Sequence, residues 1–565
     1  MKRTILVALL CAGIFGVAFG AYRVAAPPEP QLSRFVPSGA VLYLQAKNFS
    51  SLLADWDKSQ EREAWLKSKN HDVFSQSRLL LRLQSAGDEF AKAAGVPVDA
   101  DLLHQAAGRQ SALVLYDIGK LQFLFISRRA SAESMQSALW QTRSKFETRS
   151  AGGVNFFYRK DPDSDREIAF AIAGDYLLLA TREDLLAGAL QLLAGSKEHC
   201  VEEEPWWSRS VAATGAPGDL RMVLNLEKIV PSPYFRSYWV QQNITDMKRY
   251  TAAISDLTRS GSEYHEERTL LRKEAAAHDR PEGKGASAVG EILRLVPANT
   301  GFYEAKADPE PKDSLELLTA KILAPHLGPG APGTLAPQVQ LGGGETGSGS
   351  DLETRIDQPP AQTSVPGDSS APIQAVFAKN HVLAQLQLQG TERDSAGVFV
   401  RIHSAVAFLG ASDWEEPAVH AALVDFVRPG FTTGQLGVEW KTASSYSVLD
   451  GLWPLAVGVR GKYLIISDSA PLLSTTLEGL NKKPIGTAAV LAAAFDHQRE
   501  RENFAVLTKI LDVGSGSPQN GGGPEFFSEN LASLSFTLKN ISSEKIVIRD
   551  AGDRQTQTVI YAWAQ

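Results

Sequence analysis

Two adjacent residues, His199 and Cys200, have the side chains of a nucleophile and its base. An imidazole beside a thiol can lower the thiol pKa and so produce a reactive thiolate. Neighbours in sequence seldom point their side chains at each other, however, and the segment KEHCVEEEP places carboxylates nearby that would raise this pKa. We therefore predict that Cys200 is a loop or partly buried cysteine.

Two further segments match metal-site patterns only in part. DPDSDRE begins at Asp161 with the alternating carboxylates of a calcium loop, but Arg166 stands where the turn needs glycine and no glutamate closes the loop. We expect a solvated hairpin tip there. YHEER, at residues 264–268, lacks the second histidine of a zinc-peptidase helix, so we expect His265 to be exposed.

The remaining searches for chemistry give no site. Serines lie beside glycines in GETGSGSD and VGSGSP, but neither segment stands between a buried strand and a helix, as a nucleophile elbow must. No glycine-rich phosphate loop follows a strand, and the ten histidines show no pair at metal-ligand spacing. We assign no catalytic, cofactor-binding or metal-binding residues and expect no cofactor.

The composition is that of an ordinary globular protein. The chain has 565 residues, 44% of them hydrophobic and 21% charged, with a formal net charge of -7. This length predicts two to four domains. Because the sequence has no clustered lysines and arginines to neutralise phosphates, we expect no nucleic-acid partner.

The first residues have the pattern of an export signal. Lys2 and Arg3 precede an apolar run over residues 5–19. The run approaches the roughly 20 residues of a membrane span, so a cleaved signal peptide and an uncleaved anchor over residues 1–22 both remain open. In either case we expect an exported chain, periplasmic or anchored to the inner membrane through this segment.

Two sequence matches indicate an internal duplication. RFVPSGAVLYLQAK at 34–47 is similar to RLVPANTGFYEAK at 294–306, with a single-residue gap after the tyrosine. EIAFAIAGDYLLLATREDLL, from Glu167, matches PLAVGVRGKYLIISDSAPLL, from Pro454, without a gap. Because the two matches occur in the same order, we predict an α+β fold of two related lobes, each a mainly antiparallel sheet packed with amphipathic helices.

The composition also predicts the limits of these lobes. We expect a Pro-rich linker at 23–33, a first lobe at 34–274, an inter-lobe linker at 275–290 and a second lobe at 291–565. The second lobe carries a flexible insertion at 325–372 and a flexible loop at 514–524, both poor in residues that form a core.

Local patterns predict several elements. Gly174 and Gly461 each lie between two apolar runs and predict hairpins, and a helix should follow each hairpin. Amphipathic helices are expected at 49–66, 73–94 and 133–146, and a terminal meander with one solvated face at the end of the chain. Trp206, Trp207 and Trp239 are interpreted as core residues, with a partner interface as the alternative.

The opening module resembles a known family. The export signal, the Pro-rich spacer and the turn VPSGAVLYLQAKN are similar to an uncharacterised family of bacterial exported proteins, a domain of unknown function that opens with a Pro-Ala-Asp-Thr-like turn and an apolar strand. RLVPANTGFYEAK resembles that opening through Pro297, Ala298, Asn299 and Thr300. The resemblance implies a bacterial cell-envelope protein and supplies no catalytic residues.

Three functions follow from these observations. The first is a non-enzymatic binding or scaffolding protein that contacts other envelope proteins. The second is a protein that binds an apolar ligand, such as a lipid or lipoprotein, between the sheet and the amphipathic helices of the first lobe. The third is an enzyme with an unrecognised site between the lobes.

Overall fold

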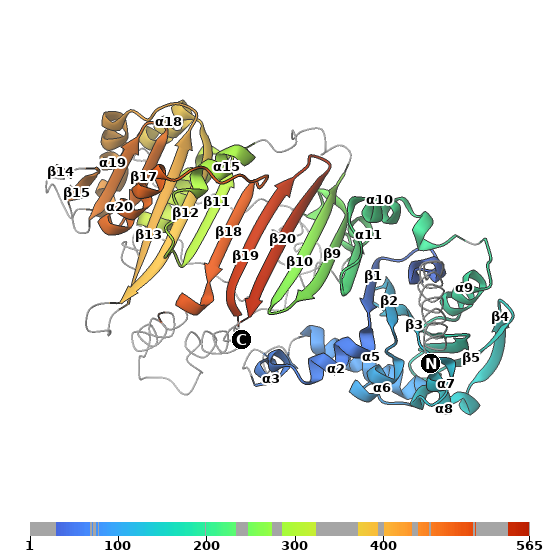
Figure 1. Ribbon diagram of the computed structural model, residues 1–565. Coiled ribbons are helices and arrows are strands. Elements are labelled where there is room, and N and C mark those ends of the chain that lie inside the picture. The colour runs from blue at the N-terminus through green and yellow to red at the C-terminus, as the bar shows by residue number, and fades with distance from the viewer. Residues whose placement is uncertain are drawn as a thin grey trace, which may run out of the picture.

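The computed structural model (Figure 1) shows an extended sheet with helices packed on it. It describes residues 30–67, 71, 75–76, 78–197, 199–232, 247–273, 285–323, 371–393, 400–431, 439–443, 445–450, 454–500, 503 and 541–563. No helix in these ranges is long and apolar enough to cross a bilayer. The expected export signal, the loop at 514–524, Trp239 and most of the insertion at 325–372 lie outside them.

Twenty strands form one sheet, and every pairing among the described strands is antiparallel. From one edge to the middle the order is β4 (Glu147–Ala151), β5 (Val154–Lys160), β6 (Glu167–Ala173), β7 (Tyr176–Ala180), β3 (Gln122–Arg128), β2 (Gln110–Asp117), β1 (Leu42–Lys47), β8 (Leu220–Asn225), β9 (Tyr250–Ser260) and β10 (Glu263–Arg272). It continues through β20 (Arg554–Trp563), β19 (Ile541–Asp550), β18 (Leu491–Asp496), β11 (Phe302–Ala307), β12 (Val382–Arg393), β13 (Val400–Gly410), β17 (Tyr463–Ser467), β16 (Leu455–Arg460), β15 (Ser447–Asp450) and β14 (Glu439–Thr442). The α+β class and the antiparallel sheet are therefore confirmed.

The two halves of this order have the same topology when each is followed outward from the β10–β20 pair. The strand registers agree as well: Leu124 pairs with Ala180 across β3 and β7, and Ala405 pairs with Ser467 across β13 and β17. Both expected hairpins are present, β6–β7 and β16–β17, and the glycine of each turn has φ +55°. A positive φ favours glycine, because glycine has no Cβ to clash with the backbone.

Strands β10 and β20 join the two halves directly. Their ladder runs from Glu263–Ala562 to Leu271–Arg554. At its end the Arg272 guanidinium donates to both carboxylate oxygens of Asp550, at 2.5 and 2.7 Å, and also to the Gly552 carbonyl, at 2.7 Å. The two side chains are only 7% and 11% exposed, so this ion pair is buried at the junction.

This junction extends our expectation for the end of the chain. Strands β18, β19 and β20 pair consecutively as the expected meander, but β20 also pairs with β10 of the first lobe. The last described strand therefore lies in the middle of the sheet, because its ladder groups are paired on both sides. Of the expected linker at 275–290, residues 286–290 belong to helix α15 (Ala286–Leu293), and most of the remainder lies outside the described ranges.

One face of the sheet is packed in the same way in both lobes. In the first lobe, Tyr43, Val114 and Leu124 on this face contact α9 (Glu183–Leu193) and α10 (Pro205–Ala213). Trp206 and Trp207 are buried in this cluster, which confirms their core assignment. In the second lobe, α15 and α20 (Ala470–Glu478) cover the corresponding strands.

The opposite face is covered differently in the two lobes. The first lobe places there α2 (Phe49–Asp57), α3 (Gln60–Leu66), α5 (Arg78–Ala94), α6 (Ala100–Ala106) and α8 (Ala138–Gln141). The second lobe places there α16 (Pro311–Leu318), a π-helical turn (Thr319–Leu323), α18 (Ala371–Asn380) and α19 (Glu416–Phe431).

Serine caps explain two departures from the expected helices. Residues 49–66 form two helices because Ser59 caps α3 by accepting from the Arg62 amide, and this cap cannot lie inside a continuous helix. The helix expected at 133–146 is wrong for the same reason. Ser137 accepts from the Trp140 amide and donates to the Ser134 carbonyl, so the segment breaks into α7 (Ser131–Ser134), α8 and a 3-10 turn (Arg143–Lys145).

The buried pair at the junction predicts a large effect of a single substitution. Arg272→Ala should lower the free energy of unfolding by about 3 to 5 kcal/mol, because it removes the counter-charge of the buried Asp550 carboxylate. The matched control is Lys379→Ala, which removes an exposed ion pair with Glu415 whose side chains are 72% and 64% exposed, and should cost less than about 1 kcal/mol. Urea unfolding of the full chain measures both. Equal effects of the two variants would contradict the importance of the buried pair.

Candidate functional site

The floor of the candidate site is the face of the first-lobe sheet opposite the core that contains Tyr43. Because successive strand residues point to opposite faces, β2 sends Leu113 and Leu115 to this face, and Val114 to the packed core. β3 does the same with Phe123 and Phe125. β1 and β7 add Leu44, Ala46 and Leu179.

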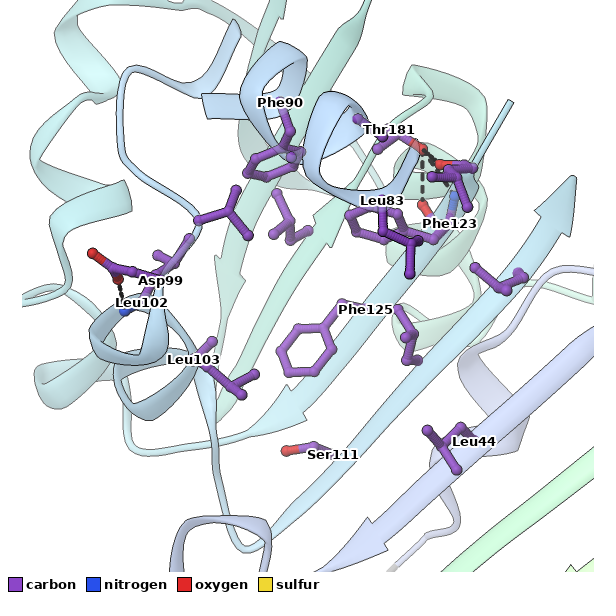
Figure 2. Close-up of a pocket in the computed structure, with 18 of the residues that line it drawn as sticks. Leu44, Leu83, Phe90, Asp99, Leu102, Leu103, Ser111, Phe123, Phe125 and Thr181 are labelled. Carbon is purple, nitrogen blue, oxygen red and sulfur yellow. Dashed lines mark hydrogen bonds between the residues drawn. The ribbon is translucent and has the colours of Figure 1, made fainter. Parts of the chain in front are cut away.

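The roof of the site is formed by α5 and α6. Leu83, Ala86, Gly87 and Phe90 recur on α5 at helical spacing and form one apolar stripe that faces the floor. From α6 come Leu102, Leu103 and Ala106. The Asp99 carboxylate starts this helix by accepting from the Leu102 amide at 2.9 Å, as Figure 2 shows.

The floor and roof enclose a cavity of about 500 Å³. Figure 2 shows Phe125 near the middle of the space, with Leu83 and Leu103 on either side of it. At the rim, Leu83, Val98 and Leu103 are 43%, 55% and 42% exposed. Large apolar side chains left in water around an apolar cavity are typical of a binding site.

The exposed apolar side chains are concentrated in this part of the chain. Ten large apolar side chains are exposed in the described residues, and six of them belong to the segment from α2 to α6: Trp56, Leu66, Leu81, Leu83, Val98 and Leu103. Residues 81–85 of α5 are exposed, whereas Phe90, Ala93 and Ala94 near its end are buried. The helix therefore packs through its C-terminal half, and its N-terminal half overhangs the cavity.

Each of the following polar side chains of the lining makes at least one hydrogen bond within the protein. The Thr181 hydroxyl accepts from the Phe123 amide at 2.9 Å. Arg166 donates to the Glu89 carboxylate at 2.6 Å and to the Lys120 carbonyl at 2.7 Å. The Ser111 hydroxyl lies 2.9 Å from the Ser127 hydroxyl. The cavity surface that a ligand meets is therefore almost entirely apolar.

The second lobe replaces much of this apolar floor with polar side chains. Tyr43 and Tyr303 pack against the corresponding cores, and the strand registers extend the correspondence outward from them. Four floor residues of the first lobe are thereby matched with polar residues of the second: Leu44, Leu113, Leu115 and Phe123 with Glu304, Gln387, Gln389 and Ser404. The same face of the second lobe is filled farther on by Phe377, Phe408 and Trp414.

The two residues that the sequence suggested for catalysis, His199 and Cys200, bond to Glu203 and not to each other. The His199 ring donates from Nδ1 to the Glu203 carboxylate at 2.6 Å, while the Cys200 thiol lies 4.0 Å from the other oxygen of that carboxylate. Cys200 is partly buried, as expected. His265 lies on strand β10, half-buried beside Glu263 at 2.8 Å, so it is not on the helix that a zinc-peptidase site requires.

The expected hairpin tip at Asp161 is present but is anchored rather than fully solvated. It joins β5 and β6, and the buried Asp161 carboxylate accepts from the Ser164 amide and hydroxyl, which lower its pKa. Lys92 of α5 donates to Asp163 at 2.6 Å. The tip therefore holds the end of α5 against the sheet. Among the described residues no three metal-ligating side chains are grouped.

The most perturbed titratable groups do not line the cavity. Burial raises the pKa of Tyr43 and of Tyr116, whose hydroxyls donate to Gln45 and to the Pro37 carbonyl. In the second lobe, the neighbouring Asp468 carboxylate raises the pKa of His403, with Glu392 adding to the effect. The His403 ring nitrogens lie 3.6 and 3.3 Å from these two carboxylates.

The sequence indicated the elements of the cavity but not its residues. The amphipathic helix at 73–94 and the strands of the first lobe were expected, and an apolar ligand between them was one hypothesis. The signal that identifies the lining is the pairing of the α5 stripe with the alternate leucines and phenylalanines of β2 and β3.

Known proteins add little to this picture. No protein-family model and no curated protein matches the chain. Crystal forms IV, I and III of TP0453 are similar to part of it, with 10%, 11% and 10% identity, coverage of 45%, 44% and 44% of this chain and 83%, 81% and 82% of that chain, and TM-scores of 0.23, 0.22 and 0.24. TM-scores this low carry no argument about this protein.

The raised pKa of His403 predicts a pH-dependent contribution to stability. A histidine whose pKa is raised in the folded state stabilises it fully below the unfolded value of about 6.5, and this contribution disappears as pH rises through the folded value. The difference in unfolding free energy between the wild type and His403→Gln should therefore be larger at low than at high pH. Urea unfolding across that range measures it; a difference independent of pH would contradict the charged pair.

Proposed function

We propose that this chain is a non-enzymatic binding protein that holds an apolar ligand in the cavity between the sheet and helices α5 and α6 of the first lobe. The observation that carries the proposal is an open cavity of about 500 Å³ whose floor, roof and rim are apolar. This volume lies in the range of roughly 300 to 1,000 Å³ typical of small-molecule sites.

The energetics support an apolar occupant. Each methylene group transferred from water into such a cavity contributes about 0.8 kcal/mol, so a chain of several methylenes can offset the cost of association. The exposed rim residues Leu83, Val98 and Leu103 would lose contact with water in the same step. An extended aliphatic chain, as in a lipid, fits this surface better than a polar metabolite.

The alternatives have less support. A scaffolding role would need an interaction surface, and the largest concentration of exposed apolar side chains coincides with the cavity helices. An enzyme with a site between the lobes would need a polar cleft there, but β10 and β20 pair directly at that junction. The cavity residues Thr181 and Arg166 are engaged in hydrogen bonds within the protein, which favours binding over chemistry.

We further propose that the two lobes arose by duplication. The strand order and registers repeat, and the junction ladder is self-complementary: Thr269 pairs with Thr556, and their counterparts Ile560 and His265 pair with each other. This pattern is typical of a two-fold symmetric dimer interface. The structure aligns the strands after Tyr43 and Tyr303 without the single-residue gap of the sequence match. That gap would pair Ala46 with Ala305, which lie on opposite faces of the sheet.

The N-terminal pattern and the resemblance of the opening module support export to the bacterial cell envelope, which we keep as part of the proposal. A protein outside the cytoplasm would meet membrane lipids or lipoproteins. The second lobe, polar where the first is apolar, would then serve as a structural counterpart rather than as a second site.

Filling the cavity should abolish ligand binding without unfolding the protein. A Cβ added at Gly87 would meet only the Val98 Cβ, at 3.9 Å, so Gly87→Phe can project its ring into the space. We expect at least a tenfold loss of affinity for a fluorescent long-chain probe, with unchanged or slightly higher thermal stability, because glycine is unfavourable inside a helix. The control is Ser85→Phe, which adds the same ring to the exposed side of α5. Equal affinities of both variants and the wild type would contradict the site.

The affinity should also depend on ligand length. In a homologous series of alkanes, each added methylene should tighten binding by up to about fourfold, corresponding to about 0.8 kcal/mol, until the cavity is full. Beyond that length the affinity should stop rising. Displacement of the fluorescent probe measures the series. Affinities that do not change with chain length would contradict burial of the chain in the cavity.

A further inference from the structure

A pair of serine hydroxyls is the polar feature at one end of the cavity. Ser111 of β2 lies at the opposite end of the cavity from Phe90 and Thr181, with Phe125 between them (Figure 2). Its hydroxyl oxygen lies 2.9 Å from that of Ser127 on the paired strand β3 and accepts from the Gly108 amide at 3.2 Å. Both serines are buried, with 3% and 0% of their surface exposed.

The hydrogen bond from the Gly108 amide to Ser111 requires glycine at residue 108. A Cβ at residue 108 would lie 2.1 Å from the Arg128 carbonyl oxygen and 2.7 Å from the Ser127 hydroxyl, so only glycine allows the chain to approach so closely. The amide of this residue therefore occupies one lone pair of the Ser111 oxygen. A serine hydroxyl has one proton to donate and two lone pairs.

The direction of the hydrogen bond between Ser111 and Ser127 follows from which hydroxyl proton has another acceptor. The two hydroxyls carry two protons, and the bond between them uses one. If Ser111 donates, the proton of the fully buried Ser127 has no acceptor among the described residues, and such an orphan donor is costly. If Ser127 donates, both lone pairs of Ser111 are occupied and its own proton is free to face the cavity, which Ser111 lines.

We propose that Ser111 donates this proton to the ligand, and hence that the ligand is an aliphatic chain carrying a neutral hydrogen-bond acceptor, such as an ester carbonyl. A neutral acceptor fits because Arg166, the cation among the lining residues, is already bonded to the Glu89 carboxylate and to the Lys120 carbonyl. A carboxylate at Ser111 would be buried without a counter-charge. This inference rests on the proposed function and specifies its ligand.

The test compares a long-chain methyl ester with an alkane of similar length on the full chain. A single added hydrogen bond should make the wild type prefer the ester by about three- to tenfold. Ser111→Ala, or Ser111→Cys if the alanine variant folds poorly, should remove this preference, so that the ratio of ester to alkane affinity falls to about one. Ser127→Ala is the matched control and should keep the preference, because Ser111 retains its proton and its bond to Gly108.

The possible outcomes separate this inference from the proposed function. Alkane binding without an ester preference in the wild type, or a preference that survives in the Ser111 variants, would overturn the role of Ser111 and leave the apolar site intact. A preference lost in Ser127→Ala as well would overturn the assigned direction of the pair. Failure of both probes to bind the wild type would overturn the proposed function itself.

Discussion

The direct pairing of β10 with β20 is the constraint on which the rest of the structure depends. It makes two lobes into one sheet, so that the two faces of the first lobe continue into those of the second. Antiparallel strands alternate their side chains between these faces, and each face must be covered or tolerate water. The buried Arg272–Asp550 ion pair stabilises the end of this ladder.

The two faces of the continuous sheet have different roles. One is packed against helices in both lobes and forms the cores that include Tyr43 and Ala305. On the other, the first lobe keeps Leu113 and Phe123 under a partly overhanging helix, while the second has Gln387 and Ser404 at the corresponding positions. A repeated fold can therefore carry an apolar cavity in one lobe and polar strand side chains at the corresponding positions of the other.

The sequence predicted those elements that are determined by residues close together in the chain. The hairpins at Gly174 and Gly461 were predictable because a glycine between two apolar runs decides them. The Arg272–Asp550 junction joins residues 278 positions apart, and nothing local distinguishes β20 from an edge strand. The sequence suggested an apolar ligand site between the sheet and the helices, but not the cavity itself. Periodicity predicts which residues face inward. It does not predict the distance between the α5 stripe and the strands, and this distance determines the cavity volume.

A crystal structure of the full chain grown with a brominated long-chain alkane would show whether the cavity holds an apolar ligand, since anomalous scattering from bromine locates the alkane independently of its weak electron density. We expect a bromine peak in the space bounded by Leu83, Leu103 and Phe125 of the first lobe, and none at the corresponding face of the second lobe. A structure in which α5 closes onto Phe123 and Phe125, leaving no cavity and no bromine peak there, would contradict this expectation.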